Sequence, residues 1–263
     1  MNKRRWLREM VTDEQIALLF TASGEDLERI VEDTMARAER ASGVERTLLE
    51  LLEAAVDEGI DDTNGAVWIS LILGELQSRE AIPLFLRALS QDDESLAEAA
   101  VDALRRIGEP ALDAVMQALD ADTTDEFQES CFKALEGAGA WDHPYLVEEA
   151  RDCVLGRLEA GGLSDRGLEA AAMALARLGD RRAIEPIKAA LAERFHNVNG
   201  SLTDALEMLE ENEAGTPLLP GLPSWEDRLT WLSRASLEGF EPPQRDRGPK
   251  RRRPTKPKDF TPP

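Results

Sequence analysis

The chain has 263 residues, of which 52 are Asp or Glu and 31 are Lys or Arg, so its formal net charge at neutral pH is −21. A charge of this sign repels phosphate groups, which argues against nucleic-acid binding by the body of the chain. Hydrophobic residues make up 42% and few of them are aromatic, a composition typical of helical proteins, and no stretch alternates Val, Ile and Thr as sheet strands do.

The first segment, residues 1–60, is predicted to form an N-terminal helical cap. Its basic start, Met1–Met10, resembles the beginning of a signal peptide, but the apolar run that follows is only Ile16–Phe20. A run of that length is too short for secretion or for crossing a membrane. We therefore expect a cytoplasmic protein.

Three capping signals in this segment predict three helices. Thr12, Ser23 and Ser42 each precede an acidic residue or Gln by three positions, which is the spacing of a helix N-terminus. These helices lack the regular pattern of the next segment. Atypical end units are what a repeat array requires to cover its terminal apolar face.

The second segment, residues 61–211, repeats one pattern of apolar residues. An Ala-Leu pair followed three residues later by an apolar residue and then Gly occurs three times, with a weaker copy on each side. The five copies end at Gln77, Gly108, Gly139, Gly179 and Glu210. Their spacings of 31, 31, 40 and 31 residues predict a solenoid in which each unit buries its apolar face against the next.

Each unit is predicted to contain two helices. Apolar residues from Leu96 to Ile107 recur three or four positions apart, which places them on one face of a first helix. Gly108 is expected to end this helix in the left-handed conformation, and Pro110 opens the second helix. Gly65–Gly74, the longest uncharged run, is expected to be the most buried helix.

The long unit between Gly139 and Gly179, and the helix just before it, contain several residues that could have chemical roles. Cys131 is predicted to be buried and Cys153 partly exposed, with a disulfide between them left open. Trp141 and Tyr145 flank a turn between helices and are candidate recognition aromatics, although ordinary packing also explains them.

The chain changes character towards its C-terminus. Residues 212–241 are predicted to be a capping segment with one short helix that starts at Ser224. Residues 242–263 contain seven prolines, eight Lys or Arg and two Asp, so this segment carries +6 and residues 1–241 carry −27. This composition predicts a disordered, proline-rich basic tail. Its candidate phosphate contacts are Lys250, Arg251, Arg252, Arg253, Lys256 and Lys258.

The repeated units resemble HEAT repeats of the short phycobilisome-lyase-like kind. The resemblance covers residues 61–211 and rests on the Ala-Leu pairs, the terminal glycines and the second helices that begin with proline and end in Ala-Leu, as Ala118–Leu119 does. It implies an all-α solenoid, a superhelix of antiparallel helix pairs. The family usually provides binding scaffolds, often with second helices on the concave side.

Enzymatic relatives of this fold supply few matching residues. Metal-dependent hydroxylases of the fold use His-Glu pairs, whereas the two histidines here, His143 and His196, precede Pro and Asn. Four close ligands for zinc are also missing from the sequence pattern. We therefore expect no metal, cofactor or catalytic residue, and leave a chromophore-lyase-like or accessory role as an alternative.

Two functions remain, with different partners. The leading prediction is a non-enzymatic scaffold or adaptor whose acidic surface binds a basic or extended protein partner. The alternative is that the basic tail binds nucleic acid or another anionic surface while the solenoid acts as an adaptor. The tail is also long enough to lie along the acidic body, in the same molecule or between molecules.

Overall fold

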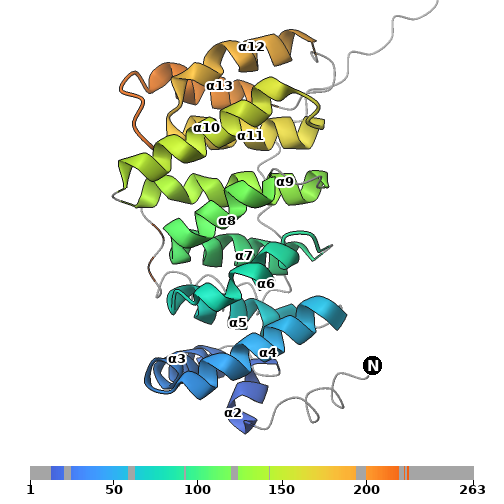
Figure 1. Ribbon diagram of the computed structural model, residues 1–263, viewed down its shortest axis with the longest axis vertical. Coiled ribbons are helices and arrows are strands. Elements are labelled where there is room, and N and C mark those ends of the chain that lie inside the picture. Colours follow the sequence, from blue (N-terminus) through green and yellow to red (C-terminus); the bar gives the residue numbers. More distant parts are fainter. Residues whose placement is uncertain are drawn as a thin grey trace, which may run out of the picture.

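The computed structural model describes residues 13–20, 25–58, 63–91, 93–119, 124–141, 143–193 and 200–218, together with residues 222 and 224. Within these ranges every regular element is a helix, and the helices stack along one axis in two layers (Figure 1). The prediction of an all-α solenoid is confirmed.

The two layers alternate along the chain. Layer A contains α5 (Thr63–Glu75), α7 (Glu94–Ile107), α9 (Asp125–Leu135), α11 (Asp165–Leu178) and α13 (Ser201–Glu211). Layer B contains α4 (Ser42–Glu58), α6 (Ile82–Ala88), α8 (Glu109–Leu119), α10 (Pro144–Ala160) and α12 (Ile184–Glu193). The short 3₁₀ turns η2 (Arg79–Ala81), η3 (Glu136–Ala140) and η4 (Arg181–Ala183) follow α5, α9 and α11.

Local capping signals explain where several of these helices begin. The hydroxyl of Thr124 accepts a hydrogen bond from the Phe127 N–H at 3.3 Å, and that of Ser164 accepts one from the Gly167 N–H at 3.1 Å, so these residues cap α9 and α11. Such caps supply partners for N–H groups that a helix start leaves unpaired. Pro110 lies in the first turn of α8, as predicted.

The core runs through both layers without a break. All of Gly65–Gly74 in α5 is buried, which confirms the prediction for this run. Gly74 lies against α7 so closely that an added Cβ would be 2.8 Å from the Cα of Ala103. Leu104, the next residue of α7 after Ala103, is completely buried. The close approach of the two helices therefore requires glycine at position 74.

The two layers differ in how closely their helices pack. Contacts between successive helices of layer A are more extensive than those between successive helices of layer B. The expectation that second helices lie on the concave side of the array stays a prediction.

The contacts also indicate where a repeat unit begins. α6 packs on α7, and α8 on α9, at least as extensively as α7 packs on α8. The compact pair thus begins with a layer B helix and ends with a layer A helix. The spacing of a repeat fixes the length of a unit and leaves its starting point undetermined.

The glycines at the ends of the copies differ in conformation. Gly179 has φ 75° and ψ 28°, the predicted left-handed conformation, whereas Gly108 has φ 78° and ψ −141°, outside that region. Gln77 occupies the glycine position of the first copy and still has φ 51°. Its side-chain amide donates a hydrogen bond to the carbonyl of Arg106 at 3.1 Å, which helps to hold this unfavourable conformation.

One other copy corrects the prediction of a glycine helix end. Gly139 lies inside η3 and not at a left-handed helix end, and an added Cβ there would be 2.8 Å from the Cβ of Pro217. The last copy has no glycine, and its Glu210 lies inside α13, which continues to Glu211.

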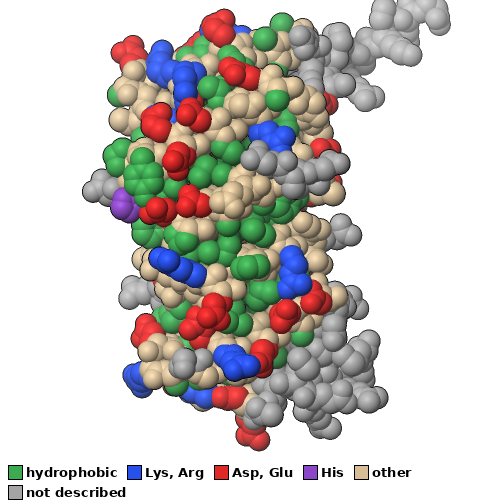
Figure 2. All heavy atoms as spheres, in the orientation of Figure 1, with side chains coloured by type: hydrophobic (Ala, Val, Ile, Leu, Met, Phe, Trp, Pro, Cys, Tyr) green, Lys and Arg blue, Asp and Glu red, His purple; other side chains and the backbone are tan. Residues whose placement is uncertain are grey.

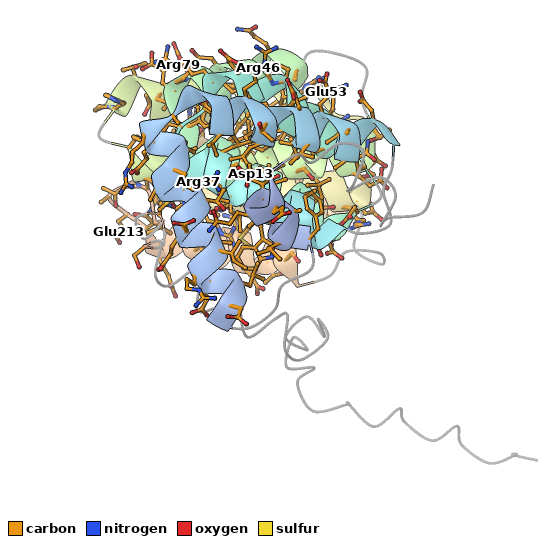
Figure 3. All side chains as sticks on the ribbon, turned by 90° about the horizontal axis from the view of Figure 1, so that it is seen from below. Asp13, Arg37, Arg46, Glu53, Arg79 and Glu213 are labelled. Carbon is orange, nitrogen blue, oxygen red and sulfur yellow. The ribbon has the colours of Figure 1, made fainter. Side chains whose placement is uncertain are left out.

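The N-terminal end is covered by α2 (Glu14–Ala17), η1 (Leu18–Phe20) and α3 (Glu25–Arg40). Asp13, and not the predicted Thr12, caps α2: its carboxylate accepts hydrogen bonds from the N–H groups of Gln15 and Ile16. It also pairs with Arg37 of α3, and Figure 3 shows the two side chains together at this end. Thr12 and Ser23 lie outside the described residues.

A segment after α13, which we call the strap (residues 212–218), runs back along the array. Its Gly215 carbonyl accepts a hydrogen bond from Arg151 of α10 at 2.6 Å, and its Leu218 N–H donates one to the Arg177 carbonyl of α11 at 2.7 Å. Pro217 reaches Gly139 of η3. The strap therefore joins the last described unit to the two units before it.

Candidate functional site

Most charged side chains of layer A have structural partners. Glu136 is almost completely buried and forms ion pairs with Arg105 at 2.7 Å and Arg177 at 2.6 Å. Lys133 of α9 pairs with Glu98 of α7 and with Glu129 of its own helix, each at 3.2 Å. These pairs join successive helices, so their carboxylates serve the packing of the array.

Arginine side chains also cap the C-terminal ends of layer A helices. Arg105 donates to the carbonyl of Lys133 near the end of α9, and Arg151 donates to the carbonyl of Leu178 at the end of α11. The last carbonyls of a helix lack partners within it, and a cation there also interacts favourably with the helix dipole. The arginines therefore hold one unit against the next.

Tyr145 is the most exposed large hydrophobic side chain in the described ranges, at 47%. Pro144 starts α10 at a position where a helix tolerates proline, and this places Tyr145 in the first turn on the layer B side. His143 lies beside it, with ring centroids 5.7 Å apart. Figure 2 shows the histidine at the edge of this side of the molecule, with acidic and apolar side chains near it.

Three carboxylates act on the Tyr145 phenol. Glu109 of α8 has the largest effect, as a hydrogen-bonding partner of the phenol, and the charges of Asp113 and Glu149 add to it. The hydrogen bond to Glu109, followed by burial and these charges, raises the pKa of Tyr145 to about 12. The phenol is therefore protonated at neutral pH and acts as a hydrogen-bond donor.

We call this surface the Tyr145 face and define it by Tyr145, Glu109, Asp113 and Glu149. The three carboxylates form no ion pair with Lys or Arg in the part of the chain that the structure describes, which contrasts with the paired carboxylates of layer A. Glu109 and Asp113 lie four residues apart on α8, and Tyr145 and Glu149 four apart on α10. That spacing puts each pair on one helix face.

Trp141 packs within the array. Its indole N–H donates a hydrogen bond to the carbonyl of Arg105 at 2.9 Å, and its ring lies 3.0 Å from where a Cβ on Gly108 would be. These contacts fit ordinary packing, and a role of Trp141 in recognition stays a prediction. Tyr145 is the more exposed of the two aromatics.

Family models match two parts of the chain. A model described as HEAT repeats matches residues 49–136, and one described as PBS lyase HEAT-like repeat matches residues 168–193. The chain is a HEAT-repeat protein. No curated protein matches it. The first match begins within α4, ahead of residue 61, and the domain boundaries inferred from the sequence stay predictions.

The two cysteines lie on different layers of the HEAT array, and they are not joined by a disulfide. Cys131 of α9 is completely buried, and Cys153 of α10 is partly exposed, as predicted. Burial, with a smaller contribution from Cys153, raises the pKa of the Cys131 thiol. The structure therefore has no disulfide between them.

Other predicted features lie beyond what the structure describes. The tail residues Lys250, Arg251, Arg252, Arg253, Lys256 and Lys258 are outside the described residues, as is the short helix predicted after Ser224. Within the described ranges, no cluster of three or more His, Cys, Asp or Glu side chains is arranged to hold a metal ion. No described helix is long and apolar enough to span a membrane.

Sequence reasoning did not identify Glu109, Asp113 or Glu149 as site residues. Each is one carboxylate among many in an acidic chain, so its type alone gives no signal. A signal was present in the spacing of these residues. Glu109 and Asp113 lie four residues apart near the start of α8, and Tyr145 and Glu149 lie four residues apart near the start of α10, the next helix of layer B. Only the stacking of α8 and α10 brings the two pairs to one place.

Proposed function

We propose that this HEAT-repeat protein is a non-enzymatic scaffold or adaptor that binds a basic, extended protein segment on the Tyr145 face. The observation that carries the proposal is an exposed aromatic ring among three carboxylates that have no ion-pair partner in the described residues. A Lys or Arg side chain placed there would gain both charge pairing and contact with the ring face.

The contrast with layer A supports this choice of surface. Carboxylates that are paired with arginine, such as Glu136, are already committed to the packing of the array. A new cation could bind them only by displacing an existing partner. A cation that binds the carboxylates of the Tyr145 face would not have to displace such a partner. The negative charge of residues 1–241 would also raise the encounter rate of a cationic partner.

The chemistry of Tyr145 supports a binding role over a catalytic one. A general base must lose its proton near the working pH, and a phenol with a pKa of about 12 does not do so at neutral pH. The neighbouring carboxylates oppose formation of the phenolate. A chromophore-lyase-like activity would have to use groups elsewhere in the chain.

Binding of a labelled oligolysine peptide tests the proposal. The host is the full-length neutral-tail variant, K250Q/R251Q/R252Q/R253Q/K256Q/K258Q, so that the chain's own tail does not compete. Into it we would place the face variant E109Q/D113N/E149Q or a matched control, D204N/E207Q/E211Q. The control residues are exposed carboxylates on α13 that form no ion pair with the described residues.

The face variant should weaken peptide binding about tenfold, which corresponds to about 1.4 kcal/mol, and the control should change it little. Binding should also weaken at high salt because the contacts are between exposed charges. Fluorescence anisotropy measures both effects. Equal losses in the two variants would mean that only net charge matters, and would remove the Tyr145 face as the site.

A second function is favoured by the separation of charge along the sequence. The +6 tail could bind nucleic acid independently of the acidic body. Gel shifts with the full chain and with the neutral-tail variant test this. If both chains shift DNA or RNA equally, or neither does, the tail has no such role.

A further inference from the structure

The strap carries the chain from α13 back towards the middle of the array. It contacts α11 through the Arg177 carbonyl and then η3 through Gly139. Tyr145 follows Gly139 by only six residues, so the two lie at most about 20 Å apart along an extended chain. The chain therefore leaves the strap close to the Tyr145 face.

We propose that the basic tail, residues 242–263, docks on the Tyr145 face of its own molecule. The inference rests on the surface assigned in the proposed function, but it does not require an outside partner. The tail would act as a built-in competitor for that partner.

The length of the chain permits this contact. Twenty-four positions separate Leu218 from Pro242, and an extended chain of that length spans up to about 80 Å. The distance from the strap to the Tyr145 face is a fraction of this. Residues 219–241 could therefore connect the two sites without strain, whatever conformation they adopt.

The chemistry of the tail matches that of the face. The tail carries eight Lys or Arg against two Asp, and the face presents three carboxylates that lack ion pairs in the described residues. Prolines at positions 249, 254 and 257 favour an extended chain, which presents its basic side chains without helix formation. An arginine stacked on Tyr145 would leave other cations within reach of Glu109 and Glu149.

Docking within one molecule also has a favourable local concentration. A tethered segment binds its site as an intramolecular partner, at an effective concentration of about millimolar for a flexible linker. Individually weak contacts between exposed charges can therefore hold the tail in place. A partner with higher affinity, or an anionic polymer that captures the tail, would free the face.

Tyr145 provides a specific reporter because it is the only tyrosine in the chain. Replacing tyrosine with fluorotyrosine during expression gives one fluorine NMR signal, at this face. A nitroxide attached to the tail at T255C, in a C153S background, broadens that signal if the tail lies near it. Cys131 is completely buried and should escape labelling. The ratio of signal intensities with the nitroxide oxidised and reduced measures proximity.

We expect strong broadening in the full chain, and little in the neutral-tail variant or at high salt. E109Q/D113N/E149Q should abolish the broadening, whereas D204N/E207Q/E211Q should preserve it. Thermal melts of all variants check that they fold. Dilution with unlabelled protein should leave the effect unchanged because the contact is within one molecule.

Three outcomes would overturn the inference. Weak broadening in the full chain would place the tail elsewhere, equal broadening in both tail forms would exclude charge as the cause, and loss on dilution would assign the contact to neighbouring molecules. None of these three broadening measurements uses the oligolysine peptide, whose binding to the neutral-tail variant tests the proposed function. The tail contact can therefore fail while the proposed function stands, and the reverse also holds.

Discussion

Layer A and the Tyr145 face use the same residue types for different purposes. In layer A the buried carboxylate of Glu136 is held between Arg105 and Arg177, and it joins three helix pairs. On the Tyr145 face, Glu109 and Glu149 surround an exposed ring and have no ion pair in the described residues.

This difference separates charges that maintain the array from charges that remain available. A strongly acidic chain offers many carboxylates, and neither charge nor exposure alone indicates which ones can bind a partner. The existing ion pairs supply that distinction. Changes to the buried and ion-paired residues of layer A should therefore affect stability, and changes on the Tyr145 face should affect binding and titration with little loss of stability.

The largest effect is expected in the core of layer A. Replacing Leu104 with Ala removes a completely buried side chain of α7 and should destabilise the fold by about 2 to 5 kcal/mol. Leu218 on the strap is 41% exposed, and its replacement with Ala should cost less than about 0.5 kcal/mol. Urea denaturation followed by circular dichroism measures both. Comparable losses of stability in the two variants would show that the assignment of Leu104 as buried and Leu218 as exposed is wrong.

The next effect concerns the buried ion pairs. Glu136→Gln leaves Arg105 and Arg177 without their shared countercharge and should destabilise the fold by about 1 to 3 kcal/mol. The figure is below that for a fully buried pair because Arg177 is 41% exposed. Glu149→Gln, the matched change on the Tyr145 face, should alter the melting temperature very little. A larger loss of stability for Glu149→Gln than for Glu136→Gln would contradict this difference between layer A and the Tyr145 face.

The two thiols should differ in their rates of reaction with a thiol reagent, because one is buried and the other is partly exposed. Cys153, on layer B, should react rapidly with a thiol reagent in the native protein. Cys131, on layer A, is buried and has a raised pKa, so it should react only as the fold opens. Mass spectrometry of partly labelled protein identifies the modified residue. Equal rates without denaturant would mean that layer A is open to solvent at α9.

The smallest effect is on the titration of Tyr145. With a single tyrosine in the chain, the ultraviolet absorbance of the phenolate reports this residue alone, and its midpoint should be about 12. Glu109→Gln removes the hydrogen-bond acceptor and a negative charge, so the midpoint should fall towards the ordinary value of about 10. A midpoint near that ordinary value in the unmodified protein would contradict the arrangement of carboxylates around the ring.

Much of the fold follows from local sequence signals. The spacing of apolar residues locates the helices, and Thr124 and Ser164 mark two starts because each cap bonds to an N–H only three residues away. Pro110 and Pro144 mark two more. Interactions over such short separations are encoded in adjacent residues, which is why they could be predicted.

The remaining features depend on contacts between distant residues. Glu136 pairs with Arg105, 31 positions before it, and Arg177, 41 positions after it, and no local pattern selects those partners. Gly139 looked like a helix end because its copy matches the others, but its role is to admit Pro217. The Tyr145 face is likewise formed by two helices that meet only when the array is stacked.

The strap has a consequence for how this array should come apart. In an ideal repeat protein each unit touches only its neighbours, so the last unit frays first and independently of units further back. Here Arg151 and Arg177 bond to the strap, and Pro217 reaches η3, two helix pairs before α13. Amide hydrogen exchange in α13 should therefore follow the opening of α11 and η3, and this end of the solenoid should unfold as one cooperative block.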